Sequence, residues 1–156
     1  MKAASISIVK KELSMRPPKD VLDICMRLAK YKKENKELLS YLLFEANDEQ
    51  QYIISVKHEI DVQFAEINRN TLYFMKKSIR KILRTTQKFI RYSVISITEV
   101  ELLIYFCGKL KTSGIPIHTS TALSNLYLAQ IQKIRHALAT LHEDLQYDYE
   151  LELKKL

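Results

Sequence analysis

The chain has 156 residues, 47% of them hydrophobic, which is long and apolar enough for a substantial buried core. Its two Gly and three Pro argue against sheet-rich folds with tight turns, and also against Gly-rich phosphate loops and dinucleotide-binding fingerprints. The formal net charge is +7, from 25 Lys and Arg against 18 Asp and Glu, and its position along the chain is more informative than its size.

Apolar residues recur at helical spacing through the first third of the chain. A short helix is expected at about residues 5–14, after which Pro17 and Pro18 end one helix and open the next. The polar stretch "KYKKENKE" then interrupts the pattern. Beyond it, "ELLSYLLFEA" is expected to form a short helix that is mostly buried.

Capping residues predict where the middle helices begin. Asn47 is a candidate N-cap for a helix through residue 67, and Asn68 or Asn70 for the helix that follows. Thr98 and Glu101 have the T-x-x-E spacing of a capping box ahead of "VELLIYFCGKL". This last segment is apolar nearly all round, so it is expected to be the central helix of the fold.

The C-terminal part is expected to contain one long amphipathic helix with a single apolar seam. Its apolar residues step by three and four along the chain, at Leu123, Tyr127, Ile131, Ile134, Leu138, Leu141 and Leu145. Such a seam serves either as intramolecular core or as the contact surface of a homodimer. Both a monomer and a homodimer therefore remain open.

These segments predict a single all-α domain over residues 1–156, with six or seven helices joined by short breaks. Short breaks favour antiparallel neighbours. "LAKYKKENKELLSYLLFEA" also looks like the helix–turn–helix unit of HEAT-type repeats, although no fixed period recurs. We expect an irregular stack of antiparallel helical hairpins, with a compact up-and-down bundle as the alternative.

A further resemblance is carried by "PPKDVLDICMRLAKYKKENKELLSYLL" and covers about the first 65 residues. This stretch resembles uncharacterised bacterial all-helical proteins of the domain-of-unknown-function type. The resemblance implies a helical protein of the bacterial cytosol and implies no activity.

The most unusual stretch is "YFMKKSIRKILRTTQKFIRY", residues 73–92, which holds seven Lys or Arg and no Asp or Glu. On a helix these cations occupy an arc of about 140°, opposite an apolar side centred near Ile79 and Thr86. They equal the net charge, because the other 18 Lys and Arg balance the acidic residues. The seven cations are Lys76, Lys77, Arg80, Lys81, Arg84, Lys88 and Arg91.

Two interpretations of these cations stay open. Carboxylates of the same chain could neutralise them, either in the C-terminal stretch "HEDLQYDYELELKKL" or at Glu59, Asp61 and Glu66. Alternatively they dock a polyanion, either RNA or DNA, or else an acidic protein. Tyr73, in line with the cations, is an aromatic ring that could stack on an unpaired base.

No catalytic or metal-binding motif is found. The four His have no metal-ligand spacing, no cofactor is implied, and Cys25 and Cys107 are expected to be buried thiols in a reducing cytoplasm. No stretch has the ~20 apolar residues of a membrane span. We therefore expect a non-enzymatic binding or scaffold protein, ahead of a protein–protein interaction module, with an enzyme as the third alternative.

Overall fold

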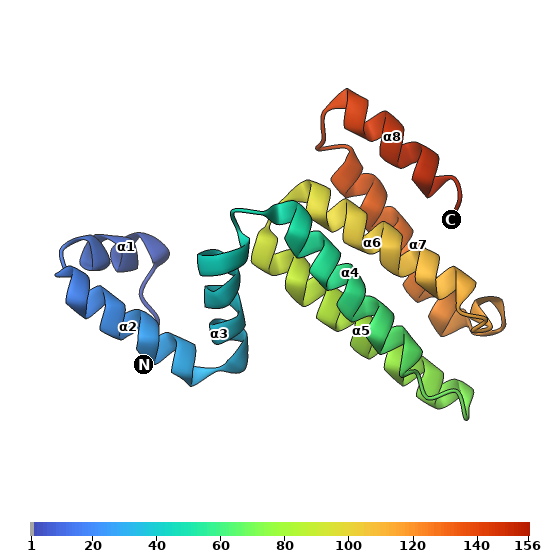
Figure 1. Cartoon of the computed structure of the whole chain (residues 1–156), viewed down its shortest axis with the longest axis horizontal. Coiled ribbons are helices and arrows are strands. Elements are labelled where there is room, and N and C mark those ends of the chain that lie inside the picture. The colour runs from blue at the N-terminus through green and yellow to red at the C-terminus, as the bar shows by residue number, and fades with distance from the viewer. Residues whose placement is uncertain (1) are drawn as a thin grey trace. The chain divides into compact units, whose positions relative to one another are not determined.

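A computed structural model describes residues 2–156, and in them eight α-helices occur and no strand, so the all-α prediction is confirmed (Figure 1). The helices are α1 (Ile6–Ser14), α2 (Pro18–Tyr31), α3 (Lys33–Ser40), α4 (Glu49–Ala65), α5 (Leu72–Ser93), α6 (Ser96–Thr112), α7 (Thr121–Leu138) and α8 (Glu143–Leu153). A π-helical turn covers Tyr41–Glu45 and a 3-10 turn covers Ile117–Thr119. Within residues 2–156, no helix has both the length and the apolar content that a membrane crossing requires.

The chain forms two compact units, Met1–Phe44 and Glu45–Leu156. The units differ in charge as well as in size. The N-terminal unit has ten Lys and Arg against five Asp and Glu, whereas the larger unit has fifteen against thirteen. Because seven of those fifteen cations lie in α5, the remainder of the larger unit has a net negative charge.

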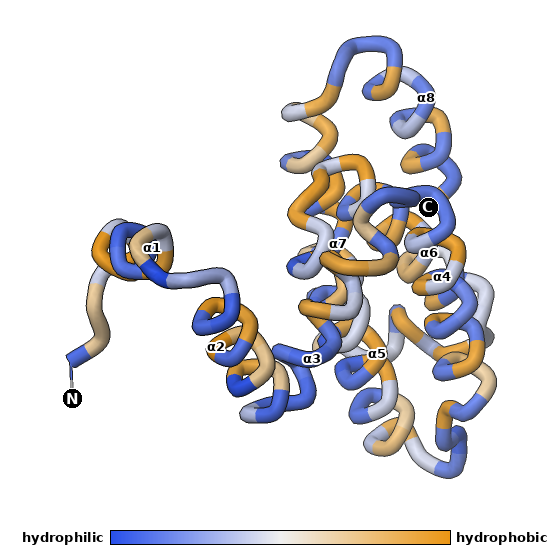
Figure 2. Tube along the Cα trace, turned by 60° about the vertical axis from the view of Figure 1, so that its left-hand side comes forward, coloured by the Kyte–Doolittle hydropathy of each residue, from blue (hydrophilic) through white to orange (hydrophobic). Residues whose placement is uncertain are grey.

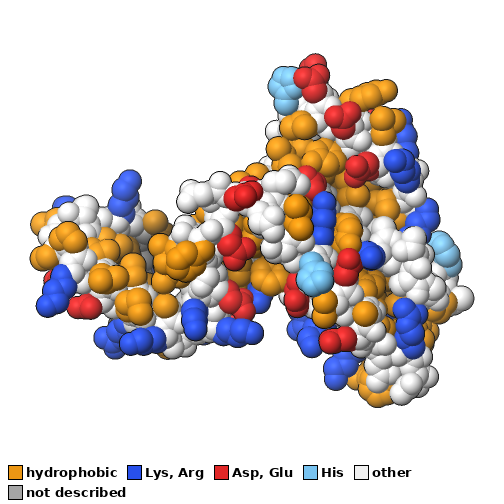
Figure 3. Space-filling model, viewed as in Figure 1, with side chains coloured by type: hydrophobic (Ala, Val, Ile, Leu, Met, Phe, Trp, Pro, Cys, Tyr) orange, Lys and Arg blue, Asp and Glu red, His pale blue; other side chains and the backbone are white. Residues whose placement is uncertain are grey.

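The N-terminal unit consists of α1, α2 and α3 and buries very little. Pro18 occupies the first turn of α2, and the Asn35 side-chain amide donates to the carbonyl of Leu28 (2.8 Å), which closes the turn into α3. Among the described residues of this unit only Tyr41 is buried. On the face seen in Figure 3, hydrophobic side chains form much of its surface, with Lys and Arg among them.

The prediction of a short buried helix in "ELLSYLLFEA" is therefore wrong in two respects. The α-helix ends at Ser40 and continues as the π-helical turn. Leu42, Leu43 and Phe44 are exposed in that turn. The segment is apolar on most sides, but three helices do not supply enough neighbours to cover all of them.

The larger unit is built around α6, as its all-round apolar pattern predicts. This helix packs against α4, α5, α7 and α8, and Figure 1 shows it running beside α4 and α7. Its side chains provide much of the core, with Val100, Leu102, Phe106, Cys107 and Leu110 fully buried. The core therefore lies where the sequence is most continuously apolar.

The helix starts differ from the predicted caps by one to three residues. Asp48, not Asn47, caps α4 by accepting the backbone N–H of Gln51 (3.0 Å), and Thr71 caps α5 by accepting that of Phe74 (3.3 Å). Asp and Thr offer the same short side-chain oxygen as Asn, so composition alone does not choose between neighbours.

The capping box predicted at Thr98 and Glu101 does not form. The α6 helix already begins at Ser96, and the buried Thr98 hydroxyl donates to the Glu49 carboxylate of α4. Ser93 donates to the same carboxylate from the end of α5. Glu49 therefore joins the start of α4 to the turn between α5 and α6, and tertiary hydrogen bonds replace the local cap.

The single helix expected over residues 123–145 is also wrong, because α7 ends at Leu138 and α8 begins at Glu143. The N–H groups of Thr140 and Leu141 turn back to carbonyls three residues earlier, at 3.1 and 2.9 Å. His142 then has extended backbone, and its Nδ1 accepts the N–H of Asp144 (3.4 Å). Glu143 and Asp144 suit the positive end of the new helix.

The seam side chains of α7 pack within the larger unit. Leu123, Ile134 and Leu138 are buried, and the Tyr127 hydroxyl donates to the carbonyl of Leu156 (2.8 Å). The α8 helix returns along α6 and α7, so the apolar spacing continues across a turn between two helices.

Candidate functional site

The two sides of α5 have opposite chemistry, which Figure 2 shows as alternating hydrophobic and hydrophilic positions along the tube. Ile79, Ile82, Leu83 and Thr86 are buried on the side that packs against α4 and α6. The buried Thr86 hydroxyl has a hydrogen-bond partner within the same helix, because it donates to the carbonyl of Ile82 (3.0 Å). This side anchors the helix and fixes which residues project outward.

The seven cations lie on the other side of α5 and are called the basic ridge below. Five of them are exposed, and these are Lys77, Arg80, Lys81, Arg84 and Arg91. Lys76 and Lys88 are half-buried. The ridge from Lys76 to Arg91 is about 22 Å long at ~1.5 Å per residue.

Six of the seven ridge cations have no salt bridge, hydrogen bond or aromatic partner for their side chains within residues 2–156; these are Lys76, Lys77, Arg80, Lys81, Arg84 and Arg91. Lys88 differs, since its ammonium lies 5.0 Å from the ring centroid of Phe89 and 6.0 Å from that of Tyr92. Lys88 is therefore held by its own helix, whereas the others project without such contacts.

Two of the carboxylates proposed to neutralise the ridge, Asp61 and Glu59, have other partners, and Glu66 is exposed and forms no salt bridge within residues 2–156. Asp61 pairs with Lys109 (2.8 Å) and accepts from the Tyr105 hydroxyl (2.7 Å). Glu59 accepts from the Gln63 amide (2.7 Å). The acidic helix α8 packs against α6 and α7. These pairings leave intramolecular neutralisation of the ridge without support.

Asp61, Tyr105 and Lys109 form a cluster of ionisable side chains between α4 and α6. Partial burial works against ionisation of Asp61, but hydrogen bonds from Lys109 and Tyr105 outweigh it and lower its pKa. Burial and the bond to Asp61 raise the pKa of Tyr105. The bond to Asp61 raises the pKa of Lys109. Each group is held in its ordinary state at neutral pH, which suits a structural ion pair.

The thiols and imidazoles show no arrangement for catalysis or metal binding. Burial raises the pKa of Cys107 to about 12, so its thiol stays protonated at neutral pH and is a poor nucleophile. Cys25 is half-buried in the N-terminal unit, and both thiols are free. No group of three or more His, Cys, Asp or Glu with metal-binding geometry occurs in the described part of the chain.

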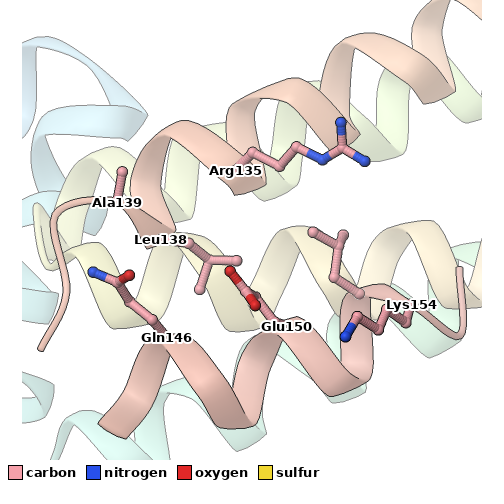
Figure 4. Close-up of a pocket in the computed structure, with 7 residues that line it drawn as sticks. Arg135, Leu138, Ala139, Gln146, Glu150 and Lys154 are labelled. Carbon is pink, nitrogen blue, oxygen red and sulfur yellow. The ribbon is translucent and has the colours of Figure 1, made fainter. Parts of the chain in front are cut away.

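A hollow of about 320 Å³ lies between α7 and α8 (Figure 4). Leu138 and Glu150 point toward one another across it, and Gln146 points toward Ala139. Gln146 is already engaged, because its amide donates to the carbonyl of Leu141 (2.7 Å). The hollow is lined by apolar side chains together with a few polar and charged ones. Its lining residues include no nucleophile paired with a general base.

A second and larger hollow accompanies the basic ridge. This groove of about 660 Å³ is lined by Tyr73, Lys76, Lys77, Arg80, Leu83, Arg84 and Gln87. Sequence reasoning identified the four cations and Tyr73 but missed Leu83 and Gln87. Gln87 lies four residues beyond Leu83, so both side chains lie on the same face of α5. Only the tertiary structure shows that this face and the cations line one groove.

Comparison of the chain with protein-family models, with curated proteins and with solved structures finds no match. The resemblance of about the first 65 residues to uncharacterised bacterial helical proteins therefore stays a prediction.

Proposed function

We propose that this protein is a non-enzymatic nucleic-acid-binding protein that docks RNA or DNA on the basic ridge of α5. The observation that supports this best is the absence of an intramolecular partner for six of the seven ridge cations within residues 2–156. A set of unneutralised cations on one helix side offers a continuous positive surface. The proposal agrees with the cytoplasmic location expected from the two thiols.

The dimensions of the ridge suit a phosphate backbone. Phosphates along one strand of a B-form duplex are about 3.4 Å apart, so a ridge of about 22 Å faces several in succession. Contacts to phosphates position a protein without reading sequence. Binding is therefore expected to tolerate many sequences and to weaken steeply with salt, with a slope of about −0.7 to −0.9 per neutralised phosphate.

The energetic cost of the ridge gives a second argument. Like charges stand at i,i+3 or i,i+4 in seven pairs, among them Lys77 with Lys81 and Arg80 with Arg84. Each such pair destabilises a helix by roughly 0.2–0.5 kcal/mol, giving a total of about 1.5–3.5 kcal/mol at low salt. A bound polyanion removes this repulsion, so the helix and the ligand stabilise one another.

The test replaces four exposed ridge cations, Lys77, Arg80, Lys81 and Arg84, by Gln, which keeps the helix propensity and removes the charge. The matched control replaces four exposed cations of the same unit, Lys133, Arg135, Lys154 and Lys155, by Gln. Both variants lose the same formal charge, so they differ only in where it is lost. Fluorescence anisotropy with labelled RNA and DNA measures Kd over a salt series.

We expect the ridge variant to lose at least tenfold in affinity, and its salt slope to become shallower by about 3. The control variant should bind within about threefold of the unchanged chain. Equal losses in both variants would show that total charge, and not the ridge, determines binding. Circular dichroism of each variant verifies that the helices are retained.

A further inference from the structure

The groove beside the ridge contains more than cations. Four of the residues that line it are Lys76, Lys77, Arg80 and Arg84, and none has an ionic partner within residues 2–156. The remaining three are Tyr73, Leu83 and Gln87. A site that binds phosphates alone has no use for an aromatic ring or an apolar side chain.

Leu83 and Gln87 are held in place by the rest of the unit. Leu83 is buried, and the Gln87 amide donates to the side-chain carbonyl of Gln130 on α7 (3.2 Å). Gln130 is itself buried and donates to the carbonyl of Leu126 (3.1 Å). This part of the groove is therefore rigid, apolar at Leu83 and polar at Gln87.

Tyr73 lines the N-terminal end of the groove, and its ring contacts that of its neighbour Phe74. Tyr73 is 66% exposed and Phe74 is 40% exposed. Their rings meet edge to face, with centroids 5.5 Å apart and planes at 72°. The Tyr73 ring therefore has one aromatic neighbour and is still mostly exposed to solvent.

We propose that the groove binds single-stranded nucleic acid, with phosphates on its four cations and an unpaired base stacked on Tyr73. This inference rests on the proposed function and specifies the strand state of its ligand. A duplex presents phosphates outward and keeps its base faces stacked inside, so it cannot use Tyr73 or Leu83. A single strand exposes the faces of its bases, which can stack on an aromatic ring whatever the base sequence.

The spacing along α5 agrees with this arrangement. Tyr73 and Arg84 are eleven positions apart, which is about 17 Å along the helix at ~1.5 Å per residue. That length accommodates a few nucleotides, with the stacked base at one end and the last phosphate contact at the other. Gln87 lies beyond Arg84, and its side-chain carbonyl and the amide hydrogen that Gln130 does not accept can face a base edge.

The experiment compares Tyr73→Leu, which removes the ring, with Tyr73→Phe, which keeps it. A matched control is Tyr147→Leu, because Tyr147 of α8 is also 66% exposed and lies outside the groove. Probes are a labelled single strand of about 16 nucleotides, as RNA and as DNA, and a duplex of the same length. Affinities are measured at one fixed salt concentration, and thermal unfolding verifies each fold.

We expect Tyr73→Leu to weaken single-strand binding by about 5- to 100-fold and to leave duplex binding unchanged. Tyr73→Phe and Tyr147→Leu should stay within about threefold of the unchanged chain. The RNA and DNA arms decide which strand the groove prefers, and either preference is compatible with the proposal. If Tyr73→Leu weakens neither single strand, or weakens strand and duplex equally, the single-strand inference is wrong.

Failure of this inference is separable from failure of the proposed function. Duplex and single strand bound equally, with dependence on the ridge cations but not on Tyr73, would remove the stacking site and keep the ridge. No binding of any nucleic acid would remove both.

Discussion

The two compact units are built from the same kind of amphipathic helix and differ greatly in what they bury. In the larger unit the central helix α6 is surrounded by four others, and Phe106 is completely inaccessible to solvent. In the N-terminal unit, α2 packs mainly against α3, and Leu22 remains 60% exposed. An apolar stripe predicts that a helix packs against another element. The number of neighbouring helices decides whether the whole stripe is buried.

The charge distribution follows the same division. The N-terminal unit has an excess of five positive charges, and the larger unit outside α5 has a negative excess. A count over the whole chain conceals this, because these two excesses cancel. The ridge on α5 is therefore a positive surface on an otherwise acidic unit, which sharpens the contrast that a polyanion would meet.

The largest change in the free energy of unfolding is expected when a core aromatic ring is removed. The matched comparison is the removal of an exposed apolar side chain from the N-terminal unit. Phe106→Ala should lower the free energy of unfolding of the larger unit by about 3–5 kcal/mol, through lost burial and the cavity left behind. Leu22→Ala should change the free energy of unfolding of the N-terminal unit by about 0.5 kcal/mol or less, because the side chain already faces solvent. Denaturant titration followed by circular dichroism measures both.

A similar loss in the two variants would mean that Leu22 is covered in solution. In that case the N-terminal unit has a partner, and the comparison between the units no longer holds.

A smaller effect is expected at the ion pair of Asp61, which links α4 to α6. Its lowered pKa stabilises the folded state at pH values above the ordinary value of 3.8, and this contribution disappears as pH falls through the lower folded pKa. Asp61→Asn should cost about 1 kcal/mol or less at neutral pH, because the pair is partly exposed. The difference from the unchanged chain should vanish in acid.

Unfolding measured over a pH series checks this prediction. A cost for Asp61→Asn that persists well below pH 3.8 would assign the effect to lost packing or hydrogen bonding, since ionisation no longer contributes there.

The smallest change in stability is expected at Val94, whose backbone has a positive φ. Val94 ends α5 in the left-handed region, with φ of 55°, and its side chain is 85% exposed. This conformation is strained for a β-branched residue, so Val94→Gly should stabilise the unit by about 0.5 kcal/mol after the entropic cost of Gly. Val94→Ala keeps the Cβ and should gain less. Thermal unfolding compares the three chains, and equal stability would show no strain at this position.

The sequence predicted the positions of helices better than their exact ends. The spacing of apolar residues placed α1, α4, α5 and α6 and identified the central helix, because periodicity reports directly on burial. It failed between α7 and α8, since the three- and four-residue steps from Leu138 to Leu145 continue across the turn. The starts of α4 and α5 differed from the prediction because Asn, Asp and Thr are all favoured N-caps, and at α6 a tertiary hydrogen bond of Thr98 replaced the predicted local cap.

The candidate site divides in the same way. The seven cations and Tyr73 were evident from composition and helical geometry, whereas Leu83 and Gln87 were not. Both look like ordinary helix residues until the contact of Gln87 with Gln130 places α7 beside them. Hydrogen bonds between segments 43 positions apart leave no local pattern to detect.

By itself the sequence determined that this protein is helical, which face of each helix is apolar, and that one helix concentrates the positive charge. These properties depend on residues close together in the chain, so a local pattern is sufficient to reveal them. Only the tertiary structure decided which apolar faces are covered, which carboxylates are already paired and where the groove lies. Those outcomes depend on which segments become neighbours, and that is a property of the packed fold as a whole.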